Sequence, residues 1–208
     1  MLSTKDLSFN YPQGATFSFP NLNITEGQSL LVLGKSGSGK TTLLHLLAGL
    51  MNPADGLVEI SGVNLVELNG SKRDKFRGEN IGIVFQSAQF VRSITVFQNL
   101  SLARSLAGLS ANNELAESLL NELGITHRMH AKPSDLSIGE RQRASIARAL
   151  VTNPKVVLAD EPTSALDDEN AALVANLLQR TVTGHGAALI VVTHDQRLKN
   201  RFQNSITL

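Results

Sequence analysis

Short runs of apolar residues recur along the chain and predict buried β-strands. They are rich in leucine or in β-branched residues and cover residues 29–34, 57–62, 81–86, 155–160 and 188–194. Helical periodicity lies between several of them, over residues 40–50, 113–123, 140–152 and 170–182. Because strands that alternate with helices usually form parallel sheets with helices on their faces, the pattern predicts an α/β fold with a mostly parallel sheet.

Two regions depart from this alternation. The first thirty residues contain alternating segments, LSFNYP and FSFPNLNI, which suit a small flanking antiparallel sheet. Residues 90–132 contain no convincing strand and predict an inserted helical subdomain. We therefore expect one domain over residues 1–208, with an α/β core made of residues 1–89 and 133–208.

Composition narrows the class of protein. The chain has 208 residues, of which 42% are hydrophobic and 18% are charged, as in folded globular domains. Its formal net charge of +1 provides no overall attraction to nucleic acid or to a lipid surface, so any anion site must be local. There is no cysteine, the apolar runs are too short to span a bilayer, and the first residues do not form a secretory signal. We expect a cytoplasmic protein with no nucleic-acid partner.

A phosphate-binding motif follows the first predicted strand of the core. The residues Gly34, Lys35, Ser36, Gly37, Ser38, Gly39, Lys40, Thr41 and Thr42 match G-x-x-x-x-G-K-[ST] and open a predicted helix. In such a loop the backbone N–H groups and the helix dipole bind phosphates. Lys40 is placed for the β- and γ-phosphates, and the Thr41 hydroxyl is a ligand for Mg²⁺. The motif predicts nucleotide binding.

Polar residues end three of the other strands. Asp160 and Glu161 follow KVVLA, which predicts that Asp160 holds Mg²⁺ and that Glu161 is free to polarise an attacking water. The alternative is a pair of solvated acids at a strand end. His194 ends a later strand and is predicted to contact the γ-phosphate, whereas the other four histidines are expected to be structural. Gln86 ends IGIVFQ and is equally consistent with a strand cap.

Taken together, these segments resemble an ATP-binding cassette ATPase, the nucleotide-binding subunit of ABC transporters. Its motifs match in order: GKSGSGKTT resembles the Walker A motif, VVLADEP the Walker B motif with the catalytic glutamate, Gln86 the Q-loop, LSIGERQR the signature, residues 164–167 the D-loop and His194 the H-loop. The resemblance implies a P-loop NTPase (RecA-like) core, ATP and Mg²⁺ as cofactors, and catalytic roles for Glu161, His194 and Gln86. Gln86 would also bind the metal. Tyr11 matches the aromatic that stacks on adenine, although Phe9 or Phe17 could serve.

The resemblance further implies a dimer with ATP between the phosphate loop of one subunit and the signature of the other. Ser137, Gly139 and Glu140, together with Asp167 of the D-loop, would complete the ATP site. Ser137 and Glu140 also have the spacing of a helix capping box. We expect a homodimer, with a paralogous cassette as the alternative, bound to transmembrane permease subunits on the inner face of the cell membrane.

The signature departs from the family pattern Leu-Ser-Gly-Gly-Gln at two positions. Glu140 replaces the glutamine, and Ile138 replaces the first glycine. A β-branched residue disfavours positive φ, so Ile138 is expected to restrict the turn and to fill space at the interface.

Residues 76–108 are most similar to cassettes of lipoprotein-release and macrolide-export systems. In that group a basic helix precedes the Q-loop strand, and the stretch after Gln86 forms a groove for a coupling helix. Lys72, Arg73, Lys75 and Arg77 fit the basic helix, for which a solvated face is favoured over lipid contact. The alternative function is a regulatory cassette that switches a membrane-bound partner without moving a solute. A P-loop kinase or a nucleic-acid cassette fits less well, because the chain has a signature and lacks tandem cassettes and heptads.

Overall fold

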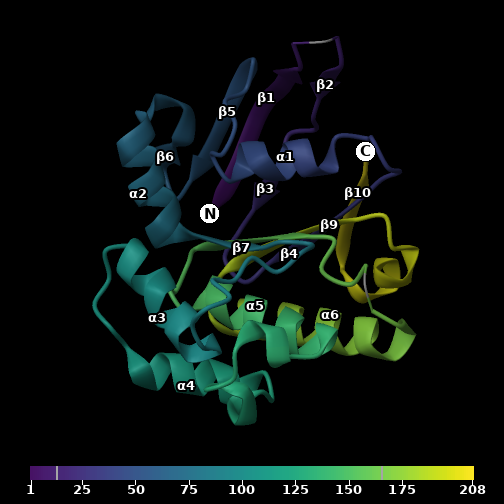
Figure 1. Cartoon of the computed structure of the whole chain (residues 1–208). Helices are drawn as coiled ribbons and strands as arrows, with labels where there is room; N and C mark the ends of the chain where they lie inside the picture. The colour runs from purple at the N-terminus through teal and green to yellow at the C-terminus, as the bar shows by residue number, and fades with distance from the viewer. Residues whose placement is uncertain (13, 165) are drawn as a thin grey trace.

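The chain forms two β-sheets separated by one helix and flanked by further helices in a computed structural model, which describes residues 1–12, 14–164 and 166–208 (Figure 1). One sheet is antiparallel and its strands follow the path β2-β1-β5-β6, with β3 also paired to β1. Its strands are β1 (Leu2–Asn10), β2 (Thr16–Ser18), β3 (Asn23–Ile24), β5 (Asp55–Ile60) and β6 (Val63–Asn64). This sheet includes the predicted strand at residues 57–62, so that strand is not part of the parallel sheet.

The second sheet is parallel throughout, in the order β10-β4-β9-β8-β7. Its strands are β4 (Ser29–Leu33), β7 (Ile81–Val84), β8 (Val156–Asp160), β9 (Ala188–Thr193) and β10 (Asn204–Thr207). The edge strand β10 was not predicted, because only Ile206 in it is apolar before the terminal leucine. β4, β8 and β9 are buried along their whole length, which explains why they read as continuous apolar runs.

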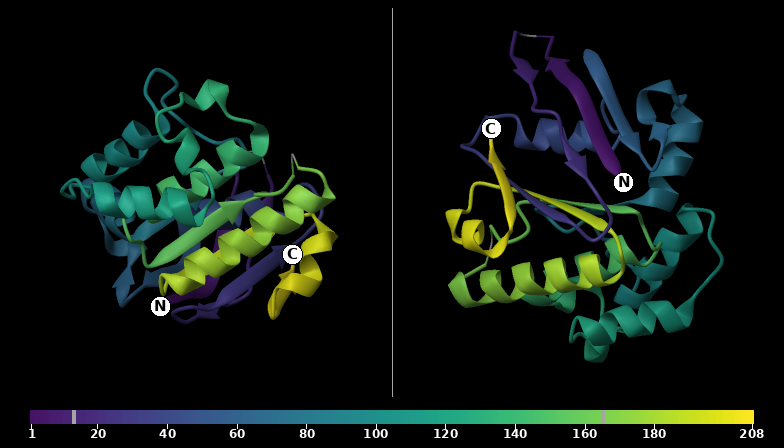
Figure 2. Two further views of the ribbon diagram at one scale, coloured as in Figure 1. Left: turned by 90° about the horizontal axis from the view of Figure 1, so that it is seen from below. Right: turned by 180° about the vertical axis from the view of Figure 1, so that it is seen from behind.

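Helices cover both faces of the parallel sheet. α1 (Lys40–Leu47) lies between the two sheets, while α5 (Ile138–Leu150) and α6 (Asp168–Gly184) run beneath the parallel one (Figure 2). The remaining helices are α2 (Gly70–Asn80), α3 (Val96–Leu106) and α4 (Asn113–Glu122), with short 3₁₀ turns η1 (Leu65–Glu67), η2 (Thr126–Arg128), η3 (Pro133–Asp135) and η4 (Gln196–Arg201). Within the described ranges, no helix is both long and apolar enough to cross a membrane.

Alternate residues of the central strands belong to two different hydrophobic clusters. In β4, Leu31 and Leu33 pack toward α5 and α6, whereas Leu30 and Val32 pack toward α1 and the antiparallel sheet. The helices α3 and α4 share the first cluster with α5. The proposed boundaries of the helical subdomain at residues 90 and 132 therefore stay a prediction. The two buried layers fix the carboxyl ends of the parallel strands in space, and these ends carry the polar residues.

Candidate active site

The phosphate loop leaves the start of α1 without a side-chain cap. Gly39 precedes α1 with φ of 92°, whereas α2 to α6 all begin with a side chain that caps the backbone. A Cβ on Gly39 would lie 2.7 Å from the Phe17 ring, so both φ and space require glycine. The Ser38 hydroxyl oxygen is buried and has no hydrogen-bond partner in the described part of the chain. Open N–H groups and an unpaired hydroxyl suit a phosphate.

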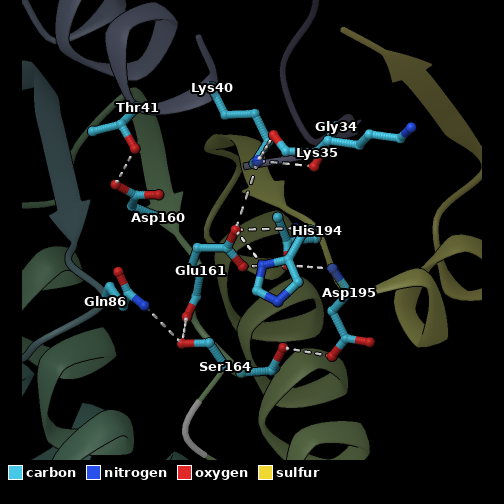
Figure 3. A network of polar contacts seen from close by, with 12 residues as sticks. Gly34, Lys35, Lys40, Thr41, Gln86, Asp160, Glu161, Ser164, His194 and Asp195 are labelled. Carbon is cyan, nitrogen blue, oxygen red and sulfur yellow. Dashed lines mark hydrogen bonds and ion pairs between the residues drawn. The ribbon is translucent and has the colours of Figure 1, made fainter. Parts of the chain in front are cut away.

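Lys40 lies at the centre of the loop. Its ammonium donates hydrogen bonds to the carbonyls of Gly34 at 2.8 Å and Lys35 at 2.9 Å, and lies 4.0 Å from Glu161 Oε1. The side chain is buried. A cation is therefore held among acceptors beside the loop, as the motif predicts (Figure 3).

Thr41 and Asp160 meet at the end of β8. The Thr41 hydroxyl donates to Asp160 Oδ2 at 3.2 Å, and burial raises the pKa of Asp160 above its ordinary value. A hydroxyl and a carboxylate are the oxygen ligands that Mg²⁺ prefers, usually alongside substrate phosphates and water. The described residues contain no cluster of three acidic or histidine side chains that could hold a metal alone. Thr41 and Asp160 therefore fit a Mg²⁺ whose remaining ligands come from a nucleotide and water.

Glu161 is held in place by hydrogen bonds, and its role in polarising an attacking water stays a prediction. Thr193 Oγ1 donates to Oε2 at 2.6 Å, the His194 backbone N–H donates to Oε1 at 3.0 Å, and His194 Nδ1 lies 2.8 Å from Oε1. Glu161 also has φ of 45°, a left-handed conformation that is rare for such a residue and concentrates at functional sites. Thr193 was not among the predicted site residues, although its position next to His194 was a signal.

A second set of polar contacts continues from this cluster. Thr163 Oγ1 donates to Asp195 Oδ2 at 3.2 Å, and Arg197 pairs with Asp195 at 2.7 Å and also with Asp168 at the start of α6. The bonds from Arg197 hold the pKa of Asp195 below its usual value. The segment after β9 is thereby tied to α6, through contacts that were not predicted from the sequence.

Gln86 lies beside the D-loop segment. Its Nε2 is 3.3 Å from Ser164 Oγ, which also donates to the Glu161 carbonyl at 3.1 Å. Gln86 is therefore connected through Ser164 to the backbone of Glu161. Ala165, in the same predicted D-loop, lies outside the described residues.

An open cavity of about 1160 Å³ lies over these groups. Its lining contains every phosphate-loop residue from Gly34 to Thr42 together with Tyr11, Phe17, Gln86, Glu161 and His194. Tyr11 Oη lies 2.9 Å from Thr42 Oγ1, and the Tyr11 ring contacts Phe17 edge-on, with their centroids 6.1 Å apart. Phe9 contacts Tyr11 but is outside the lining. Tyr11 and Phe17 both line the cavity, so which of the two contacts the base stays open.

The four signature and D-loop residues that were predicted to complete the ATP site are not in this cavity. Ser137, Gly139, Glu140 and Asp167 are all outside its lining. Asp167 caps α6 through the backbone N–H of Asn170, at 2.9 Å. Ile138 is the first residue of α5 and is absent from the positive-φ residues, in agreement with the expectation that a β-branched residue excludes positive φ there. Its side chain is 58% exposed.

The capping box at the start of α5 is confirmed. The Glu140 backbone N–H donates to Ser137 Oγ at 3.3 Å, and the Ser137 backbone N–H donates to Glu140 Oε2 at 2.9 Å. Glu140 also accepts from Arg128 Nε at 2.7 Å and lies 3.2 Å from His127 Nε2. The bond from Arg128, followed by that from Ser137, lowers the pKa of Glu140 to about 2. The charge that replaces the family's glutamine is thus paired within the chain.

The substitution Glu140→Gln tests this pairing. We expect the free energy of unfolding to fall by about 1–2 kcal/mol at pH 7, because water screens Arg128, whose side chain is 40% exposed. Since the pKa of Glu140 is depressed from 4.5 to about 2, its contribution is complete above pH 4.5 and is lost as the pH falls toward 2. The difference between the two proteins in urea unfolding should therefore narrow below pH 4.5. Glu114→Gln, at an exposed position of α4, is the control. A difference that stays constant with pH would contradict the assignment.

The fold and this site define the class of protein. A parallel sheet with a G-x-x-x-x-G-K-[ST] loop between β4 and α1, and two acids at the end of β8, is the arrangement of a P-loop nucleotide hydrolase. The model of the ABC transporter family matches residues 18–164. The chain belongs to this family and is an ABC ATPase, the ATP-binding subunit of an ABC transporter.

Individual relatives agree with this assignment. The chain is 40% identical over 190 residues to the lipoprotein-releasing system ATP-binding protein LolD of Legionella pneumophila (strain Lens), covering 90% of this chain and 84% of the relative. LolD of Geobacter metallireducens is 36% identical over 214 residues, covering 100% and 95%. The dimeric ATP-binding cassette MJ0796, solved in a post-hydrolysis state with ADP and Pi, has a TM-score of 0.88 at 32% identity and covers 100% and 94%.

Proposed function

We propose that this protein hydrolyses ATP for a transporter of the lipoprotein-releasing type, as one of two cassettes bound to transmembrane subunits at the inner face of the membrane. The observation that carries the proposal is the convergence of four distant segments on one cavity, in a chain 40% identical to a LolD protein. The contributing segments are the phosphate loop, the ends of β7 and β8, and the end of β9.

Binding of ATP begins at the loop. The uncapped start of α1 and the Lys40 ammonium bind the phosphates, while Tyr11 and Phe17 flank the adenine. Thr41, Asp160 and Gln86 would hold Mg²⁺, which neutralises charge that develops on the transferred phosphoryl group.

Glu161 positions the attacking water. Thr193 and the His194 backbone donate to its carboxylate, so the side chain is fixed and retains acceptor capacity for a water proton. His194 lines the cavity and supplies a ring nitrogen at the γ-phosphate end. Preorganised groups of this kind lower the barrier because they need no rearrangement during the reaction.

The signature belongs to the other half of a dimer. Ser137, Gly139, Glu140 and Asp167 have no place in the cavity of their own chain, so a second copy is needed to bring them to the phosphates. The relative MJ0796 has been solved as a dimer, which supports this arrangement. Ile138, exposed beside Ser137, would then lie at the interface between the two copies.

Reconstitution tests the transport role. The cassette is purified with its membrane subunits, placed in proteoliposomes with a lipid-modified lipoprotein, and given ATP. We expect release of the lipoprotein to a soluble acceptor that depends on ATP and stops with Glu161→Gln. Stimulated ATP hydrolysis without any release would instead favour the regulatory cassette.

A further inference from the structure

The short segment that follows His194 contacts the chain on both sides of the D-loop (residues 164–167). Asp195 accepts a hydrogen bond from the Thr163 hydroxyl, at 3.2 Å, just before the D-loop. Arg197 pairs with Asp168, the first residue of α6, just after it. The two ends of the D-loop are therefore held by one segment, which begins beside His194.

Asp195 and Arg197 form the centre of this arrangement. The Arg197 guanidinium donates through Nε to Asp195 Oδ1 at 2.8 Å and through Nη2 to Oδ2 at 2.7 Å. Two parallel bonds of this kind fix the orientation of both groups as well as their distance. Asp195 and Thr163 are buried, whereas the Asp168 side chain is 87% exposed. We call the Asp195–Arg197 pair the clamp.

The clamp is also connected to Glu161, and Figure 3 shows Asp195 beside His194 and Glu161. The Asp195 backbone N–H donates to Thr193 Oγ1 at 3.0 Å, and this hydroxyl donates to Glu161 Oε2 at 2.6 Å. His194, between Thr193 and Asp195 in the chain, contacts the other oxygen of the carboxylate through its backbone and its ring. A shift of Asp195 therefore moves the groups that fix Glu161.

A local cap is the simpler explanation of these contacts. Asp195 does cap η4, because the Arg197 backbone N–H donates to its Oδ1 at 3.0 Å. That bond needs no guanidinium, and it involves neither Thr163 nor α6. The two contacts that reach the ends of the D-loop are additional to the cap, and they join segments that a cap alone would leave separate.

We propose that the clamp positions Glu161 for hydrolysis by tying both ends of the D-loop to the segment that holds the Glu161 carboxylate. The inference rests on the proposed function, because it needs Glu161 as the group that positions the attacking water. Asp195 and Arg197 both lie outside the lining of the ATP cavity, so they are positioning residues that act through Glu161.

The effect of removing the guanidinium follows from the burial of Asp195. In Arg197→Met the carboxylate would keep the Thr163 hydroxyl and one backbone N–H as donors but would lose its cation. A buried charge without its counter-ion is unfavourable, so the carboxylate takes up a proton or turns toward water. Either change alters its bond with Thr163 and shifts the backbone that carries Thr193 and His194.

Steady-state ATP hydrolysis distinguishes positioning from binding. Arg197→Met should lower kcat by about tenfold or more and change the KM for ATP by less than about twofold, because the phosphate loop keeps its contacts. Asp168→Ala removes only the contact at the start of α6 and should lower kcat by about threefold. Arg197→Lys, which keeps a cation beside Asp195, should recover most of the parent rate. A parent-like kcat in both Arg197→Met and Asp168→Ala would overturn the proposal.

Each substitution has a matched control in the same element. Lys199→Met removes one positive charge from an exposed position of η4, and Glu169→Ala removes one negative charge from the exposed first turn of α6. Both should keep kcat within about twofold of the parent. An equal loss of rate in the controls would attribute the effect to net charge or to the helix dipole, and the clamp would then be wrong.

A second measurement excludes a merely structural role. In a Glu161→Gln protein, adding Arg197→Met should slow the residual hydrolysis by less than about twofold, because the carboxylate that the clamp positions is already absent. The ATP-dependent dimer of this double variant should form as in Glu161→Gln alone, measured by size exclusion. A further tenfold loss of rate would show that Arg197 acts independently of Glu161 and would overturn the proposal. If Arg197→Met does not fold, Asp168→Ala serves in its place, because the Asp168 side chain is exposed.

The outcomes separate this inference from the proposed function. If the unaltered protein hydrolyses no ATP, or Glu161→Gln hydrolyses it at the parent rate, the proposed function fails. If both behave as expected and the two clamp variants keep the parent kcat, only the role of the clamp is wrong.

Discussion

Glu161→Gln should leave a protein that binds ATP, hydrolyses it at least about 100-fold more slowly and accumulates as a dimer. The amide keeps the size of the side chain and can accept from the His194 backbone N–H, so the fold and the cavity are retained. It cannot attract a water proton as a carboxylate does, so ATP stays intact between the two subunits. Phosphate release measures the rate, and size exclusion with ATP measures the dimer.

The same substitution at a glutamate away from the site, Glu169, is the control for Glu161→Gln. Glu169→Gln removes a carboxylate from the exposed first turn of α6 and should hydrolyse ATP within about twofold of the parent rate. If Glu161→Gln remains monomeric with ATP, the proposed dimer with ATP between its two subunits is contradicted. If Glu161→Gln hydrolyses ATP at the parent rate, Glu161 is not the catalytic residue.

Lys40→Ala should reduce ATP affinity by about 100-fold or more and abolish hydrolysis at ordinary ATP concentrations. The substitution removes the ammonium that lies between the Gly34 and Lys35 carbonyls and 4.0 Å from Glu161. Without this cation, the carbonyls of the loop and the Glu161 carboxylate face the negatively charged phosphates and weaken their binding. Binding of a fluorescent ATP analogue and phosphate release give the two readouts.

The control for Lys40→Ala is Lys5→Ala on the exposed part of β1, which removes the same charge away from the cavity. Near-parental affinity in Lys40→Ala would falsify the phosphate-site assignment. Loss of affinity in both variants would point to a general effect of net charge instead.

Local sequence patterns correctly predicted those elements whose structure depends on a few neighbouring residues. β4, β8 and β9 were predicted because strands buried on both faces must be apolar throughout. The capping box of Ser137 and Glu140 was predicted because both of its bonds form within four residues. The phosphate loop was also predicted, because Gly39 and the start of the helix that follows it are neighbours in the sequence.

Long-range pairing decided what the patterns left open. The strand at residues 57–62 joins the antiparallel sheet because β5 pairs with β1, some fifty residues away, and no local pattern encodes that partner. Glu161 is fixed by Thr193 and His194, and Glu140 is neutralised by Arg128, through contacts between different elements. Arg148 of α5 lies over the Phe90 ring, another contact between segments that are distant in the sequence.

The residues alone predicted the fold class and the phosphate loop, because periodicity and turn chemistry are local properties. The resemblance of the motifs, in their order, to those of ABC cassettes indicated the family and the other ATP-site residues. The tertiary structure decided which side chains meet: it brought Lys40, Asp160, Glu161 and His194 to one edge of the sheet and left Ser137 and Asp167 outside the cavity. The physical reason is that charges and hydrogen-bond donors act over a few ångströms. Their pairing therefore depends on how distant segments pack.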